Sequence, residues 1–196
     1  MMEFTFGRYG TVNQTLFGFG FKSINIGNTR ITGYDVSISG KGNVGVMNYL
    51  FSVGYTEIDP IKKDFIPEKD TLTATAKYNV LKYRFKTMWK LDAELNYRKI
   101  TIGMSARYYS FMENIDAVFQ DELVAGSGIY AIPGVKRYRE LNKEGNWIYD
   151  GRLSYLIQKN TTIAFVIKNC FNHEYGMRPA DLQPPRIYNL QVSIKF

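Results

Sequence analysis

Residues 83–97 read YRFKTMWKLDAELNY, with apolar and polar side chains alternating at every second position. One set is mostly apolar or aromatic: Tyr83, Phe85, Thr87, Trp89, Leu91, Ala93, Leu95 and Tyr97. The other set is mostly charged or polar: Arg84, Lys86, Met88, Lys90, Asp92, Glu94 and Asn96. Because successive side chains of a strand point to opposite sides of a sheet, this period predicts one long strand with two chemically different faces.

The same alternation recurs along the chain and predicts an antiparallel meander of about eight strands. Besides 83–97, the segments with this pattern are 1–7, 29–39, 44–57, 100–108, 147–155, 162–171 and 186–196. Short turns are expected at 40–43, around Arg98 and at 158–161. Long connections are expected at 8–28, 58–75, 111–145 and 172–186. This spacing puts the short turns at one end, the long loops at the other, and both chain termini on the short-turn side.

We expect an all-β fold, an antiparallel transmembrane β-barrel, although a soluble barrel with its apolar face turned inward shows the same alternation. Strands of about ten residues match a tilted membrane crossing. An aromatic girdle at the membrane interface is predicted from Tyr83, Tyr97, Tyr108, Tyr109, Trp147 and Tyr188. Charges of both signs fit a wet lumen better than a packed core. The predicted lumen-facing charges are Arg84, Lys86, Lys90, Asp92, Glu94, Arg107, Asp150 and Arg152.

The composition excludes several other classes of protein. The 196 residues include 25 Lys and Arg against 18 Asp and Glu, a net charge of +7, and 15 Tyr, 13 Phe and 2 Trp, which excludes a disordered tail or a charge-rich coiled coil. The single cysteine, Cys170, excludes an intramolecular disulfide and a thiolate metal cluster. No apolar run approaches the roughly 18 residues of a membrane helix. The opening residues MMEFTFG do not have the pattern of a signal peptide.

Several motifs with a known chemical use have a simpler structural interpretation. The stretch GKGNVG at 40–45 matches a dinucleotide-binding pattern, but the residues after it favour a strand, so a tight turn is expected. Asp92 and Glu94 share a face with Lys90, which indicates a solvated charge ladder rather than an acid–base pair, and no enzyme activity is expected. A lone histidine, His173, in a polar loop predicts no resident metal or cofactor. The positive charge is dispersed, so no nucleic-acid partner is expected.

The long connection at 111–145 contains two segments of interest. ENIDAVFQDEL (113–123) is predicted to form a short amphipathic helix. YAIPGVKRYREL (130–141) brings apolar and cationic groups together. Loops of this size on a rigid barrel are binding elements or mobile lids, so this connection is a candidate binding region.

Three stretches resemble the TonB-dependent receptors of Gram-negative outer membranes. The final strand RIYNLQVSIKF is similar to their C-terminal insertion signal, carried here by Tyr188, Leu190, Val192, Ile194 and Phe196. FVIKNCFNHEY (165–175) resembles their penultimate strand and the start of the last loop, with Cys170 where leucine is usual. SINIGNTRITGYDVSISG (23–40) resembles another of their strands, with Asp35 in the acidic position. The last loop, with His173 and Arg178, is therefore a candidate ligand loop.

The resemblance implies that residues 1–196 form the C-terminal part of a barrel of about twenty-two strands, without the plug domain, TonB box and signal peptide of the family. It implies uptake of a scarce nutrient across the outer membrane, with a ferric siderophore or another iron complex favoured over cobalamin or an oligosaccharide. The implied partners are outer-membrane lipid and lipopolysaccharide, the barrel assembly machinery, TonB and a small nutrient ligand. We expect that this segment alone cannot perform gated uptake.

Two other interpretations remain open at this point. A self-contained eight-stranded outer-membrane barrel with an adhesion, structural or lipid-modifying role would need a closed ladder between its first and last strands. A soluble β-cup that binds a small apolar ligand would turn its apolar face inward and purify without detergent.

Overall fold

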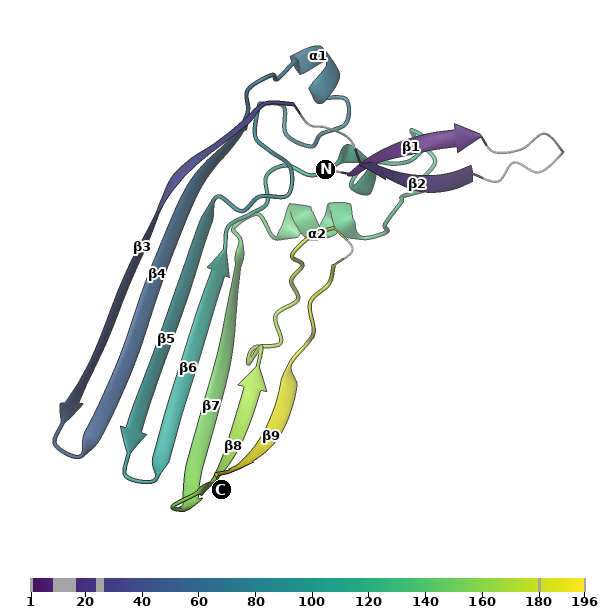
Figure 1. The fold of residues 1–196 in the computed structure, drawn as a ribbon. Helices are drawn as coiled ribbons and strands as arrows, with labels where there is room; N and C mark the ends of the chain where they lie inside the picture. Colours follow the sequence, from purple (N-terminus) through teal and green to yellow (C-terminus); the bar gives the residue numbers. More distant parts are fainter. Residues whose placement is uncertain (1, 9–16, 24–26, 180, 196) are drawn as a thin grey trace.

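The computed structural model describes residues 2–8, 17–23, 27–179 and 181–195. Seven consecutive antiparallel strands form one sheet in the order of the sequence (Figure 1), which confirms the predicted all-β antiparallel meander. These strands are β3 (Thr29–Val44), β4 (Met47–Lys62), β5 (Thr87–Tyr97), β6 (Ile100–Tyr109), β7 (Asn146–Gln158), β8 (Thr161–Lys168) and β9 (Ile187–Ile194). The helical elements are α1 (Pro67–Asp70), the 3₁₀ turn η1 (Ala117–Phe119) and α2 (Val135–Leu141).

The connections differ sharply in length at the two ends of the sheet. Two-residue turns at 45–46, 98–99 and 159–160 join the strands at one end, which we name the turn end. Connections at 63–86, 110–145 and 169–186 join them at the other end, the loop end (Figure 1). Gly45 at φ +60° and Arg98 at φ +54° provide the left-handed backbone that a two-residue hairpin turn requires.

The N-terminal part of the prediction is wrong in two respects. The segment expected as the first strand of the meander forms β1 (Met2–Arg8), which pairs with β2 (Phe17–Ser23) in a separate two-stranded sheet. The large sheet therefore has seven strands and begins with β3. Because seven is odd, β3 starts at the loop end while β9 finishes at the turn end, so the sheet does not begin and end on the short-turn side.

Residues paired across neighbouring strands share a face of the sheet, and the register gives each face one chemistry. We name the apolar face by rows such as Gly42, Tyr49, Leu95, Ile102, Leu153, Phe165 and Leu190. We name the polar face by rows such as Lys41, Leu50, Glu94, Gly103, Arg152, Val166 and Asn189. Many large side chains of the apolar face are exposed, with Met104 at 58% and Leu190 at 69%.

Glycines on the apolar face of β3 allow aromatic rings of β4 to lie across the strand. A Cβ atom on Gly40 would lie 2.5 Å from the Phe51 ring, and one on Gly42 would lie 2.5 Å from the Tyr49 hydroxyl. The two rings therefore cover the backbone at these glycines, a known way to stabilise a strand that lacks side chains.

The strand expected at 83–97 begins only at Thr87. Tyr83 has a positive φ of 60°, and the backbone amides of Lys86 and Thr87 bond the Ser110 hydroxyl at 3.0 and 3.1 Å rather than a ladder carbonyl. Tyr83, Arg84, Phe85 and Lys86 consequently lie in the connection that precedes β5, although their alternation continues that of the strand. The alternation of apolar and polar residues therefore extends four residues beyond the N-terminal end of the strand.

The buried core lies at the loop end. Away from this core, the side chains on both faces of the sheet are more exposed. Ile115 in the β6–β7 connection is 0% exposed and Ile148 on β7 is 1% exposed. Ile148 pairs with Arg107 and thus belongs to the polar face. The long connections therefore pack against the polar face at its loop end, and no equivalent layer covers the apolar face within the described residues.

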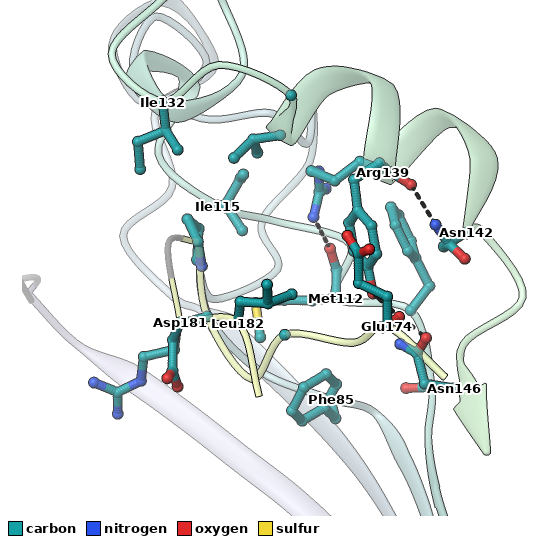
Figure 2. A pocket seen from close by; sticks show the side chains of 18 of the residues that line it. Phe85, Met112, Ile115, Ile132, Arg139, Asn142, Asn146, Glu174, Asp181 and Leu182 are labelled. Atoms are coloured by element: carbon teal, nitrogen blue, oxygen red, sulfur yellow. Dashed lines mark hydrogen bonds between the residues drawn. The ribbon is translucent and has the colours of Figure 1, made fainter. Parts of the chain in front are cut away.

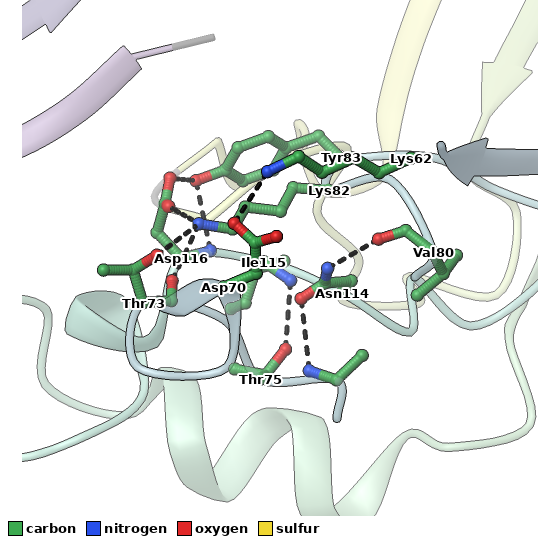
Figure 3. Close-up of polar contacts among 11 residues, drawn as sticks. Lys62, Asp70, Thr73, Thr75, Val80, Lys82, Tyr83, Asn114, Ile115 and Asp116 are labelled. Carbon is green, nitrogen blue, oxygen red and sulfur yellow. Dashed lines mark hydrogen bonds and ion pairs between the residues drawn. The ribbon is translucent and has the colours of Figure 1, made fainter. Parts of the chain in front are cut away.

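Buried polar contacts join the β4–β5 connection to the β6–β7 connection (Figure 3). The buried Asn114 side chain accepts from the Ala76 amide at 3.1 Å and donates to the Val80 carbonyl at 2.8 Å. The Thr75 hydroxyl accepts from the Ile115 amide at 3.0 Å. The Asn114 side chain thus satisfies two backbone groups of a segment that otherwise makes only isolated bridges to its neighbours.

Charged groups reinforce the same junction. Asp116 pairs with Lys82 and accepts a hydrogen bond from the Tyr83 hydroxyl (Figure 3). Burial, together with the Asp116 hydrogen bond, raises the pKa of Tyr83. At the start of the connection, burial opposes ionisation of Asp70, but bonds from the Lys62 ammonium at 2.6 Å and from a backbone amide outweigh it and lower the Asp70 pKa.

No helix within the described ranges is long and apolar enough to cross a membrane.

Substituting Asn114→Ala should loosen the junction of the two loops. The change leaves the Ala76 amide and the Val80 carbonyl without partners in a buried site, and we expect a cost of about 1–3 kcal/mol. Hydrogen exchange of residues 74–82 should accelerate accordingly, whereas Asn48→Ala, at an exposed strand position by the turn end, should leave it unchanged. Equal exchange in both variants would contradict this role for Asn114.

Candidate functional site

A cavity of about 360 Å³ lies at the loop end between the β6–β7 connection, which contains α2, and the β8–β9 connection (Figure 2). Its wall is mainly apolar and includes Phe85, Phe111, Met112, Ile115, Ile132, Pro133, Val135, Pro179 and Leu182. Polar groups that line it are Ser110, Tyr138, Arg139, Asn142, Asn146, Glu174, Arg178 and Asp181. An apolar concave site with a few convergent polar groups is the usual form of a small-molecule site.

Arg139 on α2 holds the wall of this cavity together. Its guanidinium donates to the Met112 carbonyl at 2.8 Å, the Glu113 carbonyl at 3.3 Å and the Gln120 side chain at 3.0 Å. It also lies 4.6 Å from the centre of the Phe111 ring. Burial lowers the pKa of this guanidinium. Because the ordinary pKa of arginine is so high, the side chain nevertheless stays protonated and positively charged. Three of the guanidinium N–H groups are therefore occupied by acceptors of the loop, all of them neutral.

Asn146, at the start of β7, connects α2 with the last loop. Its carbonyl oxygen lies 2.8 Å from His173 Nε2 and 3.4 Å from the Tyr138 hydroxyl, which donates to it. Burial raises the pKa of Tyr138. His173 also lines a second cavity of about 380 Å³, which shares Tyr138 and Asn142 with the first. The predicted ligand-loop histidine is thus a partner of Asn146.

Asn169 fixes the path of the β8–β9 connection. It is 4% exposed and has a φ of +51°, and its backbone N–H donates to the Asp150 carboxylate at 2.8 Å. Its side chain accepts from the His173 amide at 2.9 Å and donates to the His173 carbonyl at 2.8 Å and the Pro184 carbonyl at 3.3 Å. Asn172, at φ +53°, accepts from the Arg186 amide at 2.8 Å. Asparagine tolerates the left-handed region better than most residues, which explains its use twice in KNCFN.

Arg178, the other predicted ligand-loop residue, lies at the edge of the first cavity together with Asp181 and Glu174. All three are exposed. The backbone of this loop turns back on itself, since the Asp181 amide donates to the Arg178 carbonyl at 3.1 Å and Gly176 bridges to Leu182. One cation and two carboxylates at exposed positions thus line the cavity beside its mainly apolar wall.

The predicted lumen charges separate into two groups. Six of them occupy the polar face of the sheet: Lys90, Asp92, Glu94, Arg107, Asp150 and Arg152. Arg107 pairs with Asp150 at 2.7 Å, and Arg152 pairs with Glu94. Arg84 and Lys86 precede β5, and Lys86 pairs with Glu113 at 2.9 Å. Burial raises the pKa of Glu113.

The remaining predicted positions fall as follows. Tyr188, Leu190, Val192 and Ile194 lie on the apolar face of β9, while Phe196 lies outside the described residues. The glycine-rich stretch 40–45 runs from the end of β3 into the two-residue turn before β4. Among the described residues, no group of three His, Cys, Asp or Glu side chains is arranged to hold a metal ion.

Sequence reasoning missed the residues that shape the cavity. The helix expected at 113–123 is only the three-residue η1, whereas α2 forms at 135–141 inside the segment described as mixed apolar and cationic. Asn146 and Asn169 gave no signal by periodicity. The Gly134 that precedes α2, at φ +91°, is the one local marker of where that helix starts.

Comparisons with known proteins support the fold. No family model and no curated protein sequence matches the chain. Among solved structures, the chain is similar to the ferric-catecholate import receptor Fiu of E. coli K12 in its closed form, with a TM-score of 0.58 and 20% sequence identity. The match covers 86% of this chain and 21% of that receptor, so the chain spans about a fifth of the receptor's length. The seven-stranded meander therefore has the fold of part of an import-receptor barrel.

Substitutions at Asn169 should separate its two roles in the last loop. Asn169→Gly removes the side-chain hydrogen bonds but keeps easy access to positive φ, whereas Asn169→Ala loses both. We expect Asn169→Ala to open the 169–186 loop more readily than Asn169→Gly, by about 1 kcal/mol. Limited proteolysis and hydrogen exchange of this loop measure the difference, with the exposed turn variant Asn160→Ala as control. Identical behaviour of the two Asn169 variants would exclude a backbone contribution.

Proposed function

We propose that the chain is a membrane-spanning segment of a TonB-dependent outer-membrane receptor that takes up a scarce nutrient, with an iron complex as the favoured cargo. The observation that carries this proposal is the apolar face of the seven-stranded sheet. Its rows expose large side chains such as Ile102, Leu153 and Val192 at 53%, 52% and 62%. An exposed apolar surface of this extent marks contact with lipid or protein.

The polar face supports the same assignment. Its charges form ion pairs across strands, Arg107 with Asp150 and Arg152 with Glu94, and remain partly exposed. Charges of this kind are tolerated where water reaches them, as in the lumen of a wide barrel. The sheet then has lipid on one face and an aqueous lumen on the other, with the long connections outside the cell and the short turns in the periplasm.

The edges of the sheet favour a larger barrel over a self-contained small one. Within the described residues, β3 pairs only with β4 and β9 pairs only with β8. A closed eight-stranded barrel would pair its first and last strands, and an exposed edge is a site of further pairing. We therefore propose that more strands of the same receptor pair with β3 and β9. A plug, TonB and the assembly machinery would act on that complete protein, and we propose no enzymatic step.

The loop-end cavity is the part of this segment that we assign to ligand binding. Its wall is mainly apolar, and the Arg139 guanidinium in it already donates hydrogen bonds to the loop. Such a wall fits an uncharged or apolar portion of the nutrient. The exposed Arg178 beside this wall can meet an anionic portion, which is compatible with a ferric siderophore. The import receptor with the similar fold is described as a ferric-catecholate receptor, and this supports an iron complex over cobalamin or an oligosaccharide.

Arginine substitutions on the two faces of β7 should distinguish lipid from lumen. Leu153 is on the apolar face and the adjacent Ser154 is on the polar face. If the apolar face is covered by lipid, Leu153→Arg should make the free energy of folding into phosphatidylcholine vesicles less favourable by about 2–4 kcal/mol, the cost of arginine near mid-membrane. Ser154→Arg should cost far less. Protease protection and heat-dependent gel mobility report insertion, and equal tolerance of both variants would contradict the membrane assignment.

Nutrient uptake should depend on the cavity in the bacterium that makes this protein. Deleting the gene should reduce uptake of radiolabelled iron from at least one ferric siderophore, and restoring it should recover uptake. Ile132→Asp, which puts a carboxylate into the apolar wall, should raise the half-saturating concentration about tenfold. Leu72→Asp, at a 76% exposed loop position, is the matched control. Unchanged iron uptake after deletion, with loss of cobalamin or oligosaccharide uptake, would identify a different cargo.

A further inference from the structure

The turn end of the sheet has an unusual charge distribution. Four exposed cations lie there: Arg98, Lys99, Lys159 and Lys195. The turns at 45–46, 98–99 and 159–160, and the two strand residues on either side of each, contain no acidic side chain. The nearest acidic side chain on β5, Glu94, is already paired with Arg152. We name the four residues the turn-end cations.

Backbone contacts connect the segments that carry the turn-end cations. The Leu156 amide donates to the Lys99 carbonyl at 2.8 Å, which joins the β5–β6 turn to β7 close to the β7–β8 turn. The Lys195 amide donates to the Asn160 carbonyl at 2.8 Å, which joins the end of β9 to that same turn. The two turns and the end of β9 that carry the cations therefore lie along the turn end of the sheet, from β5 to β9 (Figure 1).

This edge directly borders the apolar face. The last full apolar row before the turns consists of Val44, Met47, Tyr97, Ile100, Tyr155, Ile163 and Val192. The Arg98 guanidinium lies 5.4 Å from the centre of the Tyr97 ring. Aromatic side chains at the end of an apolar band mark the depth of the lipid headgroups. Arg98 and Lys99 lie one residue beyond this row, and Lys159 and Lys195 lie four and three residues beyond it, so we place all four at or beyond the level of the phosphates.

The loop end differs because carboxylates lie among its cations, and some of these cations are paired with them. There Lys62, Lys82 and Lys86 each pair with a carboxylate, Asp70, Asp116 and Glu113 respectively. For the turn-end cations, the described residues provide no ion pair and no side-chain hydrogen bond. Within the described residues, no carboxylate compensates the positive charge at the turn end, which lies where we expect lipid phosphates.

We propose that the turn-end cations form a binding edge for the headgroups of anionic phospholipids in the membrane leaflet at the turn end. The proposal rests on the proposed function in that the apolar face is covered by lipid. Basic clusters of about four to eight residues beside a membrane-embedded surface attract anionic lipid, and each cation strengthens the attraction about fivefold. The edge would fix the depth and tilt of β5 to β9 in the membrane.

A lipid titration of the chain in uncharged detergent micelles tests the proposal. Native mass spectrometry would measure occupancy by dioleoyl phosphatidylglycerol and by dioleoyl phosphatidylcholine. We expect the anionic lipid to bind at least tenfold more tightly, with a preference that declines as sodium chloride is raised, because exposed charges are screened by salt. The variant Arg98→Gln/Lys99→Gln/Lys159→Gln/Lys195→Gln should abolish the preference. Equal binding of the two lipids by the unchanged chain would overturn the proposal.

A second quadruple variant controls for net charge. Lys63, Lys69, Lys136 and Lys143 are exposed cations in the long connections, and changing all four to Gln removes the same charge from the loop end. This variant should keep the preference, and an equal loss in both variants would show a general charge effect and overturn the proposal. If the first variant does not fold, Arg98→Gln/Lys99→Gln and Lys159→Gln/Lys195→Gln each should lower the preference. Failure of the chain to insert into phosphatidylcholine vesicles counts instead against the proposed function.

Discussion

The rest of the structure depends on one constraint: a sheet whose two faces require different surroundings. Each step along a strand reverses the direction of the side chain, so a period of two separates apolar from polar residues over the whole sheet. The register keeps this separation across seven strands, from Gly42 on β3 to Leu190 on β9. A shift of one residue at any strand pair would put charges such as Glu94 and Arg152 among the apolar rows, so the register is strongly specified.

The polar packing of the molecule is concentrated at the loop end, for a related reason. Long connections make only isolated backbone bridges, and many of their remaining backbone groups bond to side chains. Asn114 and Asn169 provide such side chains, each serving two or more backbone groups of a neighbouring segment. Arg139 does the same for the carbonyls around Met112. These buried polar residues give the connections a defined shape, and the cavity beside α2 is a result of that shape.

The two ends of the sheet differ in how cations and carboxylates are distributed. At the loop end, cations such as Lys82 are matched with carboxylates and contribute to tertiary structure. On the polar face, opposite charges on neighbouring strands pair in the same manner. At the turn end, Arg98 and Lys159 are matched with no carboxylate of the described chain. The net charge of +7 is therefore distributed over three regions, the loop end, the polar face and the turn end, in which the charges have different physical roles.

The sequence alone determined the all-β meander, the contrast between its faces and the alternation of short turns with long loops, because all three follow from local periodicity and turn composition. Periodicity did not reveal that β5 begins at Thr87, that residues 2–8 pair with 17–23, or that the sheet has an odd number of strands. Periodicity also did not predict that Asn146 lies beside His173 or that Arg139 donates hydrogen bonds to loop carbonyls. Those outcomes were decided by tertiary structure, because they depend on contacts between segments distant in the chain, whose energies no local pattern contains.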